Sequence, residues 1–427
     1  MNSYLEMDRT SLENELNEVK LLLEEKIKQN IKLDMSRGKP GKEQLLLSSG
    51  LLTSVSDADQ CFDGSIDARN YGVLAGLPSA RALFADILDV SPSQVFVGGN
   101  ASLQLMYDLI SKAYTHGLLH SPAPWAMRGT VRFLCPSPGY DRHFKISQSF
   151  GMELIPVSMT PSGPDMDTVE QWIKDPSVLG MWCCPKYSNP DGIIYSNETI
   201  KRIASLHPAA PDFTVIWDNA YCVHEFDGDY VPFPDILSLC AENGNRDMVY
   251  EFTSTSKITF PGAGISCMAS SEENIDYMTK LISVQIISYD KLNQLRHVLF
   301  LKDKAHVLEL MKKHAEVLRP HFELVESILE SEIKPLEIAH WTNPKGGYFI
   351  SLYAMHGTAK RTLELCSKAG VTMTGAGATY PYGIDPFDSN IRIAPSLPSL
   401  EELRQATEIL CLCLRHSALE QLLQTRM

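Results

Sequence analysis

The sequence has none of the features that mark a membrane or secreted protein. No apolar run reaches the roughly 18 to 20 residues that a helix needs to cross a bilayer. The first ten residues include Glu6 and Asp8 and lack a basic segment followed by an apolar one, so we expect no secretory signal. These absences predict a cytoplasmic protein without a membrane partner.

An excess of positive charge and the common metal-binding patterns are also missing. Lys and Arg number 38 against 52 Asp and Glu, a net charge of −14 that argues against nucleic-acid binding. A small anionic substrate is compatible with this charge, because a few local cations are enough to bind it. The ten cysteines form no pair of C-x-x-C units and no H-E-x-x-H motif occurs, so we expect no metal site and buried free thiols.

The order of short apolar runs and helical patterns predicts how the 427 residues are organised. Between about residues 80 and 270 the two alternate, which is typical of an α/β domain with a mostly parallel sheet. After residue 291, long helical stretches precede strand-like segments and a final amphipathic helix, which indicates a smaller α+β domain. We expect a large domain at 51–292 and a small domain at 293–427. The segment 1–50 begins with a helix, capped by Thr10, that packs with the small domain.

Polar residues follow several of the apolar runs, at the sheet edge where open α/β sheets bind ligands. Lys257 comes after the run 248–252 and a row of hydroxyl residues, and Asp218 ends the run 214–217, with Tyr221 three residues later. A solvated turn lysine and a helix-capping aspartate would explain the first two equally simply. A carboxylate buried at a strand end, however, needs a cation or a strong donor.

Three further segments carry polar groups with both a structural and a functional interpretation. Asn189-Pro190-Asp191-Gly192 is ordinary turn chemistry, although a fixed Asn can also present its amide to a ligand. The segment 98–102 opens a helix, and a helix start can bind an anion. Arg392 lies in the predicted strand 390–394, where an inward-facing arginine needs an anionic partner.

The combination of these motifs is more specific than any one of them. In chain order they are a Gly-rich helix start, Tyr140 after Pro138-Gly139, Asn-Pro-x-Gly, Asp-x-x-Tyr, Ser-x-x-Lys and a late arginine. Over nearly the whole chain this order resembles the fold-type I pyridoxal-phosphate aminotransferases of class I. The segments 36–40, 257–264 and 378–383 look like the aspartate aminotransferase subgroup called type Ic. The resemblance implies a three-layer large domain of the PLP-transferase type beside the smaller α+β domain.

The resemblance also implies a role for each residue around the cofactor ring. Lys257 forms the resting Schiff base with pyridoxal phosphate and moves a proton between the substrate Cα and the cofactor. Asp218 keeps the pyridine nitrogen protonated, Asn189 and Tyr221 hold the phenolic oxygen, and Tyr140 stacks on the ring.

For the cofactor phosphate, the resemblance implies a cradle at the helix start with one unusual feature. Class I enzymes commonly carry an arginine eight residues after the lysine, and here that position is Ile265. Another cation must therefore balance the phosphate. Tyr71 resembles the tyrosine that reaches the phosphate from the neighbouring subunit, which implies a homodimer with shared active sites. The other phosphate ligands implied by the resemblance are Asn100, Ala101, Ser102, Ser254 and Ser256.

For the substrate, the resemblance assigns Arg392 to the α-carboxylate, with Asn189 also in reach of it. Gly38 lets the N-terminal segment close over the substrate. A dicarboxylate needs a second cation, and the sequence leaves four candidates open, namely Arg37, Lys39, Lys291 and Arg296.

The leading functional hypothesis is transfer of the amino group of L-aspartate to 2-oxoglutarate by a ping-pong route. An aminotransferase for aromatic, kynurenine-like or aliphatic amino acids is the nearest alternative, followed by a PLP-dependent lyase. A PLP-binding sensor domain would need a basic helix-turn-helix domain ahead of it. Only about 35 residues of mixed charge precede Arg37, so we do not expect that architecture.

Overall fold

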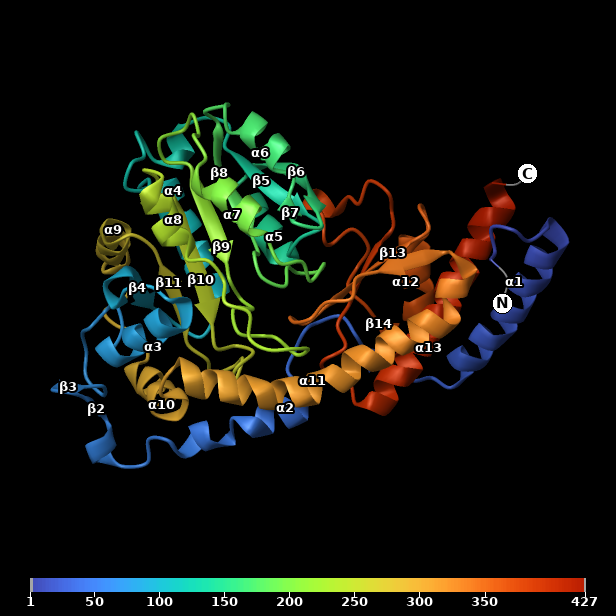
Figure 1. Cartoon of the computed structure of the whole chain (residues 1–427), viewed down its shortest axis with the longest axis horizontal. Coiled ribbons are helices and arrows are strands. Elements are labelled where there is room, and N and C mark those ends of the chain that lie inside the picture. The colour runs from blue at the N-terminus through green and yellow to red at the C-terminus, as the bar shows by residue number, and fades with distance from the viewer. Residues whose placement is uncertain (1–2, 426–427) are drawn as a thin grey trace.

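An eight-stranded sheet forms the centre of the larger of two hydrophobic cores in the computed structural model, which describes residues 3–425 (Figure 1). Neighbouring pairs among β5, β6, β8, β9 and β10 are parallel, whereas β11 and β7 pair antiparallel with their neighbours. The predicted α/β fold with a mostly parallel sheet is therefore confirmed. In spatial order the strands are β4 (Val95–Val97), β11 (Ser266–Ala269), β10 (Val249–Ser254), β9 (Thr214–Asp218), β8 (Val178–Cys183), β5 (Arg132–Ser137), β6 (Glu153–Thr160) and β7 (Gly163–Pro164).

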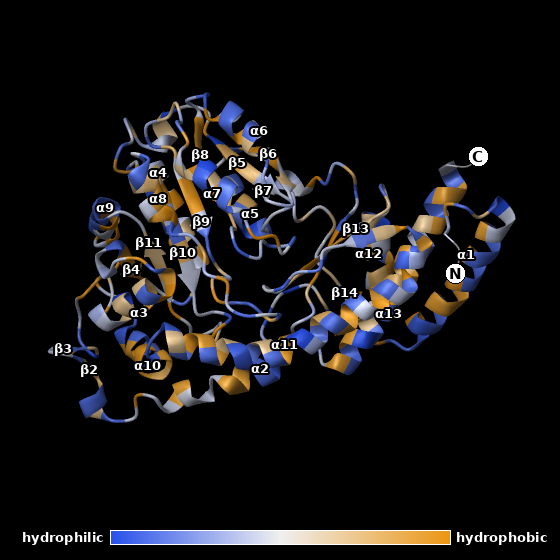
Figure 2. Ribbon diagram, viewed as in Figure 1, coloured by the Kyte–Doolittle hydropathy of each residue, from blue (hydrophilic) through white to orange (hydrophobic). Residues whose placement is uncertain are grey.

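The apolar runs predict five of these eight strands, namely β4, β5, β8, β9 and β10, and they miss β6, β11 and the two-residue β7. In β6, Pro156 and exposed positions interrupt the apolar pattern, and β11 has only four residues, two of them Ser266 and Ala269. Figure 2 shows the difference in character, because β8 is coloured mostly hydrophobic while the surrounding helices alternate. A strand buried on both faces needs such a continuous apolar run.

Helices pack around this sheet. The helices α3 and α9 pack on β4, α4 packs on β11 and β10, α8 packs on β10, and α5 packs on β6. The helices are α3 (Pro78–Leu88), α4 (Ser102–Thr115), α5 (Asp141–Ser149), α6 (Met166–Trp172), α7 (Asn197–Ala204), α8 (Ile236–Glu242), α9 (Glu272–Ile282) and α10 (Lys291–Leu301).

A second hydrophobic core lies between the antiparallel sheet β12-β13-β15 and the helices α1, α11 and α13. The helices α1 and α13 lie side by side at one end of the molecule, and α11 runs from there to the large sheet's side (Figure 1). The domain boundaries near residues 50 and 292 stay predictions. The elements are α1 (Arg9–Lys28), α11 (Lys304–Glu332), β12 (Ala339–Trp341), β13 (Ile350–Ala354), α12 (Ala359–Lys368), β15 (Asn390–Ile393) and α13 (Leu400–Thr425).

Short elements tie the N-terminal segment to both cores. The strand β1 (Leu33–Asp34) pairs in parallel with β14 (Val371–Thr372), and α2 (Lys42–Leu47) packs on α11. A two-stranded hairpin, β2 (Phe62–Asp63) with β3 (Ile66–Asp67), follows. Over residues 3–425, no helix combines the length and apolar character required to cross a membrane.

The start of the first helix differs from the prediction by two residues. Asp8, not Thr10, is the N-cap of α1, and its carboxylate accepts the Ser11 amide at 2.8 Å. Thr10 lies inside the helix. Asp is a strong capping residue, and it caps the helix two residues before Thr10.

Candidate active site

The residues that follow β8, β9 and β10 line a cavity of about 670 Å³. Its other walls come from the first turn of α4, from β15 and from the N-terminal segment, so that elements of both hydrophobic cores meet there. Most of the site residues expected from the sequence line this cavity. They are Arg37, Gly38, Lys39, Ala101, Ser102, Tyr140, Asn189, Asp218, Tyr221, Ser254, Ser256, Lys257 and Arg392.

Four expected residues are not part of the cavity lining. The Asn100 side chain donates to the Pro261 carbonyl at 3.3 Å, and Arg296 lies on α10. Tyr71 is 79% exposed. Lys291 is buried beside the Tyr71 loop, where its ammonium donates to a backbone carbonyl at 3.0 Å. Within one chain, Lys291 and Arg296 therefore do not line the cavity, whereas Arg37 and Lys39, the other two candidates for binding a second substrate carboxylate, do.

Asp218 is the last residue of β9 and is held by a residue that the sequence motifs do not reveal. Its Oδ2 lies 2.8 Å from Nε2 of His143, and its buried Oδ1 has no hydrogen-bond partner among the described residues. His143 on α5 stacks flat on Trp182, with ring centres 4.4 Å apart. A histidine three residues after Tyr140 carries no signal of its own, because its contact with Asp218 arises only when α5 packs on the sheet.

Lys257 lies in the turn after β10, between two aromatic rings. Its Nζ is 5.1 Å from the ring centre of Tyr221 and 5.6 Å from that of Tyr348. Burial lowers the pKa of Lys257, while the charge of nearby Asp218 opposes that shift. A lowered pKa gives more of the neutral amine, which is the nucleophilic form.

Arg392 on β15 presents its guanidinium to the cavity from a fixed position. Its terminal nitrogens donate to Asn189 Oδ1 and Thr374 Oγ1, both at 3.1 Å, and one lies 3.4 Å from Asp141. The Phe349 ring supports it, with 4.7 Å between the guanidinium carbon and the ring centre. The buried Nε has no partner among the described residues, so Arg392 retains a donor for an anion.

The start of α4 offers backbone donors to an anion. Ala101 is its N-cap and makes no side-chain capping bond, which leaves the first amides of the helix available. Ser254 and Ser256 lie beside it, with their hydroxyls 3.0 Å apart. Ile265 is buried in the core and its amide donates to Thr255 Oγ1, so the position that carries an arginine in many class I enzymes is here structural.

These groups fit pyridoxal phosphate. The unpartnered Asp218 oxygen suits a protonated ring nitrogen, the Lys257 amine suits the aldehyde, and the α4 amides suit the phosphate. Tyr140 lines the same cavity, where its ring can cover one face of the cofactor.

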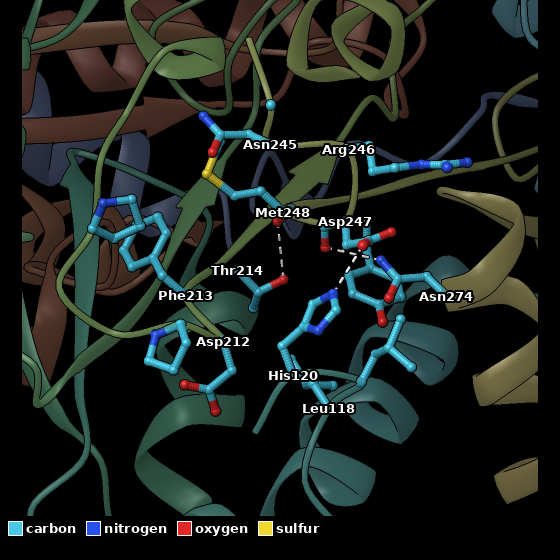
Figure 3. A pocket seen from close by; sticks show the side chains of 15 residues that line it. Leu118, His120, Asp212, Phe213, Thr214, Asn245, Arg246, Asp247, Met248 and Asn274 are labelled. Atoms are coloured by element: carbon cyan, nitrogen blue, oxygen red, sulfur yellow. Dashed lines mark hydrogen bonds and ion pairs between the residues drawn. The ribbon is translucent and has the colours of Figure 1, made fainter. Parts of the chain in front are cut away.

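The opposite edge of the sheet has a smaller cavity of about 150 Å³, at the amino ends of β9 and β10 (Figure 3). Its polar groups bond to one another. His120 lies 2.8 Å from Asp247, and Thr214 donates to the Met248 carbonyl at 3.2 Å. This arrangement stabilises the strand starts and offers few free groups to a ligand.

Comparison with known proteins decides the family. The family model described as aspartate amino-transferase matches residues 7–426. The chain belongs to the aspartate aminotransferase family. An aspartate aminotransferase from Corynebacterium glutamicum is 44% identical over 404 residues, covering 94% of this chain and 93% of that protein. A crystal structure of an aspartate transaminase from the same species has a TM-score of 0.95 at 42% identity, covering 98% of this chain and 99% of the other.

A more distant structure agrees with the family fold. The α-aminoadipate aminotransferase LysN from Thermus thermophilus, complexed with N-(5'-phosphopyridoxyl)-L-leucine, has a TM-score of 0.73 at 20% identity and covers 93% of this chain and 94% of that one. Membership of the aspartate aminotransferase family confirms the expected transaminase activity and the expected cofactor, pyridoxal phosphate.

Proposed function

We propose that this aminotransferase moves the amino group of L-aspartate to 2-oxoglutarate by a ping-pong route. The observation that carries the proposal is the charge of the cavity, which is strongly positive in a chain of net charge −14. Two carboxylates, Asp141 and Asp218, are outnumbered by six cations. The cations are Arg37, Lys39, Arg142, Lys145, Lys257 and Arg392.

The positive excess matches the negative charge of the expected ligands. The cofactor phosphate brings a charge of about −2 at neutral pH, as phosphate monoesters do. A dicarboxylate such as aspartate or 2-oxoglutarate brings two further carboxylates. Four cations besides Lys257 and Arg392 line the cavity, which leaves cations both for a second carboxylate and for the phosphate that Ile265 cannot neutralise.

Each residue has a distinct task in this proposal. When bound, the cofactor supplies an aldehyde and a ring that withdraws electrons from the substrate Cα. Asp218, held by His143, would keep the ring nitrogen protonated. Asn189 and Tyr221 would hold the phenolic oxygen. The Lys257 amine would hold the cofactor at rest and would then move the substrate Cα proton.

Arg392 orients the substrate by its α-carboxylate, and Gly38 permits the close approach of the N-terminal segment. A Cβ on Gly38 would lie 2.8 Å from the Phe349 ring, against which the Arg392 guanidinium packs. Any larger residue would therefore push the segment away from the carboxylate site. This contact supports Gly38 as part of the substrate cover, which consists of the cavity-lining residues Arg37, Gly38 and Lys39 of the N-terminal segment.

We also propose a cytoplasmic homodimer in which Tyr71 completes the partner's phosphate site. The exposure of Tyr71 and the Lys291 bond that holds its loop support this arrangement. All ten cysteines are unpaired and nine of them are buried, which supports a reducing compartment.

The test is a pair of half-reactions followed by absorbance. Adding aspartate to the yellow, cofactor-loaded enzyme should convert it to the pyridoxamine form, and 2-oxoglutarate should restore the colour. Phenylalanine and alanine are the comparison substrates. An absorbance that does not change with aspartate but changes with phenylalanine or alanine would overturn the aspartate assignment. Release of pyruvate and ammonia without added keto acid would indicate a lyase.

A further inference from the structure

The turn that carries Lys257 is held from behind by buried polar residues outside the cavity. Residues 255–259 form one helical turn, closed by bonds from the Ile258 and Thr259 amides to the Thr255 carbonyl. The carbonyl of Ile258, the residue after Lys257, accepts two hydrogen bonds. His314 Nε2 donates at 3.0 Å and Ser48 Oγ donates at 3.1 Å.

These donors come from elements far apart in sequence, and both are fully buried. His314 lies on α11 and is 1% exposed, and Ser48 follows α2 and is 0% exposed. Neither lines the active-site cavity. Since Ile258 offers only a carbonyl, His314 must carry its proton on Nε2, which makes Nδ1 an acceptor.

Gln44 satisfies that acceptor and connects it to the cavity. Its Nε2 lies 3.2 Å from His314 Nδ1 and donates to the Tyr348 hydroxyl at 2.9 Å. Its Oε1 accepts the amide of Gly41 at 3.2 Å. Burial also lowers the pKa of His314 to about 4, so the neutral ring that this network requires is stable at physiological pH.

The network ends at Tyr348 on one side of the active site and at Gly41 on the other. Tyr348 is one of the rings beside the Lys257 amine, and its Cβ would lie 3.1 Å from a Cβ on Gly38. Gly41 ends the short segment that begins with the cavity residues Arg37, Gly38 and Lys39. One buried amide side chain therefore contacts both the substrate cover and the support of the lysine.

We propose that Gln44, Ser48 and His314 are positioning residues that fix the Lys257 amine and link it to the N-terminal substrate cover. The proposal rests on the proposed role of Lys257. His314 and Ser48 bond directly to the lysine turn, so their loss should mainly change the chemical step. Gln44 acts on both ends, so its loss should also weaken substrate binding.

The test compares His314→Leu with His314→Gln and with a control on the same helix. The Nε2 of glutamine can still donate to Ile258, whereas leucine cannot. His321, two turns further along α11, is also buried and lies 3.1 Å from a backbone carbonyl, that of Pro398, so His321→Leu removes a similar contact away from the lysine. Each cofactor-loaded enzyme is titrated with acid and base while its absorbance is recorded.

For His314→Leu, we expect the pH midpoint of the absorbance change to move by at least about 0.5 unit. We expect kcat to fall about tenfold with KM for aspartate within about threefold, because a small displacement of a reacting group is costly. His314→Gln should restore both quantities and His321→Leu should leave both unchanged. Gln44→Met should lower kcat and also raise KM, and the Gln44→Met, His314→Leu double variant should move the midpoint no further than His314→Leu alone.

Equal midpoints and equal kcat in His314→Leu and His321→Leu would overturn the proposal. If His314→Leu does not fold, Ser48→Ala provides the same comparison, since it removes one hydroxyl and leaves α11 intact. Borohydride reduction and peptide mapping of the wild-type enzyme test the role of Lys257 separately from that of the network. A label absent from Lys257 would overturn its proposed role, whereas a labelled Lys257 with unaffected variants would overturn the positioning network alone.

Discussion

His143 Nε2 lies 2.8 Å from Asp218 Oδ2, and the other carboxylate oxygen has no hydrogen-bond partner within residues 3–425. The contact fixes the carboxylate at the end of β9, and the stacking of His143 on Trp182 fixes the histidine in turn. A buried carboxylate with one satisfied and one free oxygen is arranged to receive a cation. In the proposed function that cation is the protonated ring nitrogen of the cofactor.

Replacing His143 should therefore weaken catalysis without removing the site. We expect His143→Leu to lower kcat about tenfold, because Asp218 loses its orientation but keeps its charge. Asp218→Asn should be more severe, at least about 100-fold, since the charge itself is lost. Steady-state kinetics and the absorbance of the bound cofactor check both variants, and equal losses in the two would contradict this division of roles.

Arg392→Lys should impair every amino-acid substrate alike. Lysine cannot reproduce the two-pronged contact with a carboxylate, so we expect kcat/KM to fall at least about tenfold for aspartate and for alanine. Removal of the cation that binds the second carboxylate should lower kcat/KM for aspartate only. The variants that test this are Arg37→Gln, Lys39→Gln, Arg142→Gln and Lys145→Gln, and four variants with no such selectivity would count against a dicarboxylate substrate.

Glu251 should make the protein less stable as the pH rises. It is buried on β10 and bonds to Asn219, and burial raises its pKa to about 8. Below the pKa of the unfolded chain, near 4.5, both states are protonated and there is no penalty. Between that pH and about 8 only the unfolded state ionises, so stability falls across this window.

Glu251→Gln keeps the acceptor for Asn219 but cannot ionise. We expect its Tm to exceed that of the wild type slightly at pH 5 and by more at pH 8. Thermal unfolding at the two pH values checks this, and a difference in Tm that does not grow between them would show that Glu251 is not the titrating group.

Mixing two impaired variants tests whether Tyr71 serves the partner's site. Lys257→Ala should abolish turnover, and Tyr71→Ala should weaken cofactor binding. If the sites are shared, a mixed dimer contains one site with both native residues, so random reassociation should recover about a quarter of the wild-type activity. Activity that stays at the average of the two parents would show that Tyr71 does not reach the partner's site.

The sequence by itself determined the α/β class and much of the cavity lining. Short apolar runs rich in Val, Ile and aromatic residues indicate buried strands, and polar residues directly after parallel strands lie at one sheet edge, which brings Asp218 and Lys257 together. The combination and order of the motifs then resembled a known family of aminotransferases. These features are local, so each can be read from a few consecutive residues.

The tertiary structure alone decided which distant residues support that lining. His143 reaches Asp218 across the packing of α5 on the sheet, and Gln44 and His314 meet across about 270 residues of chain. The same packing removed Lys291 and Arg296 from the cavity. Such buried side chains contact each other only because whole helices and strands pack together, so the contacts cannot be predicted from the residues that neighbour them in sequence.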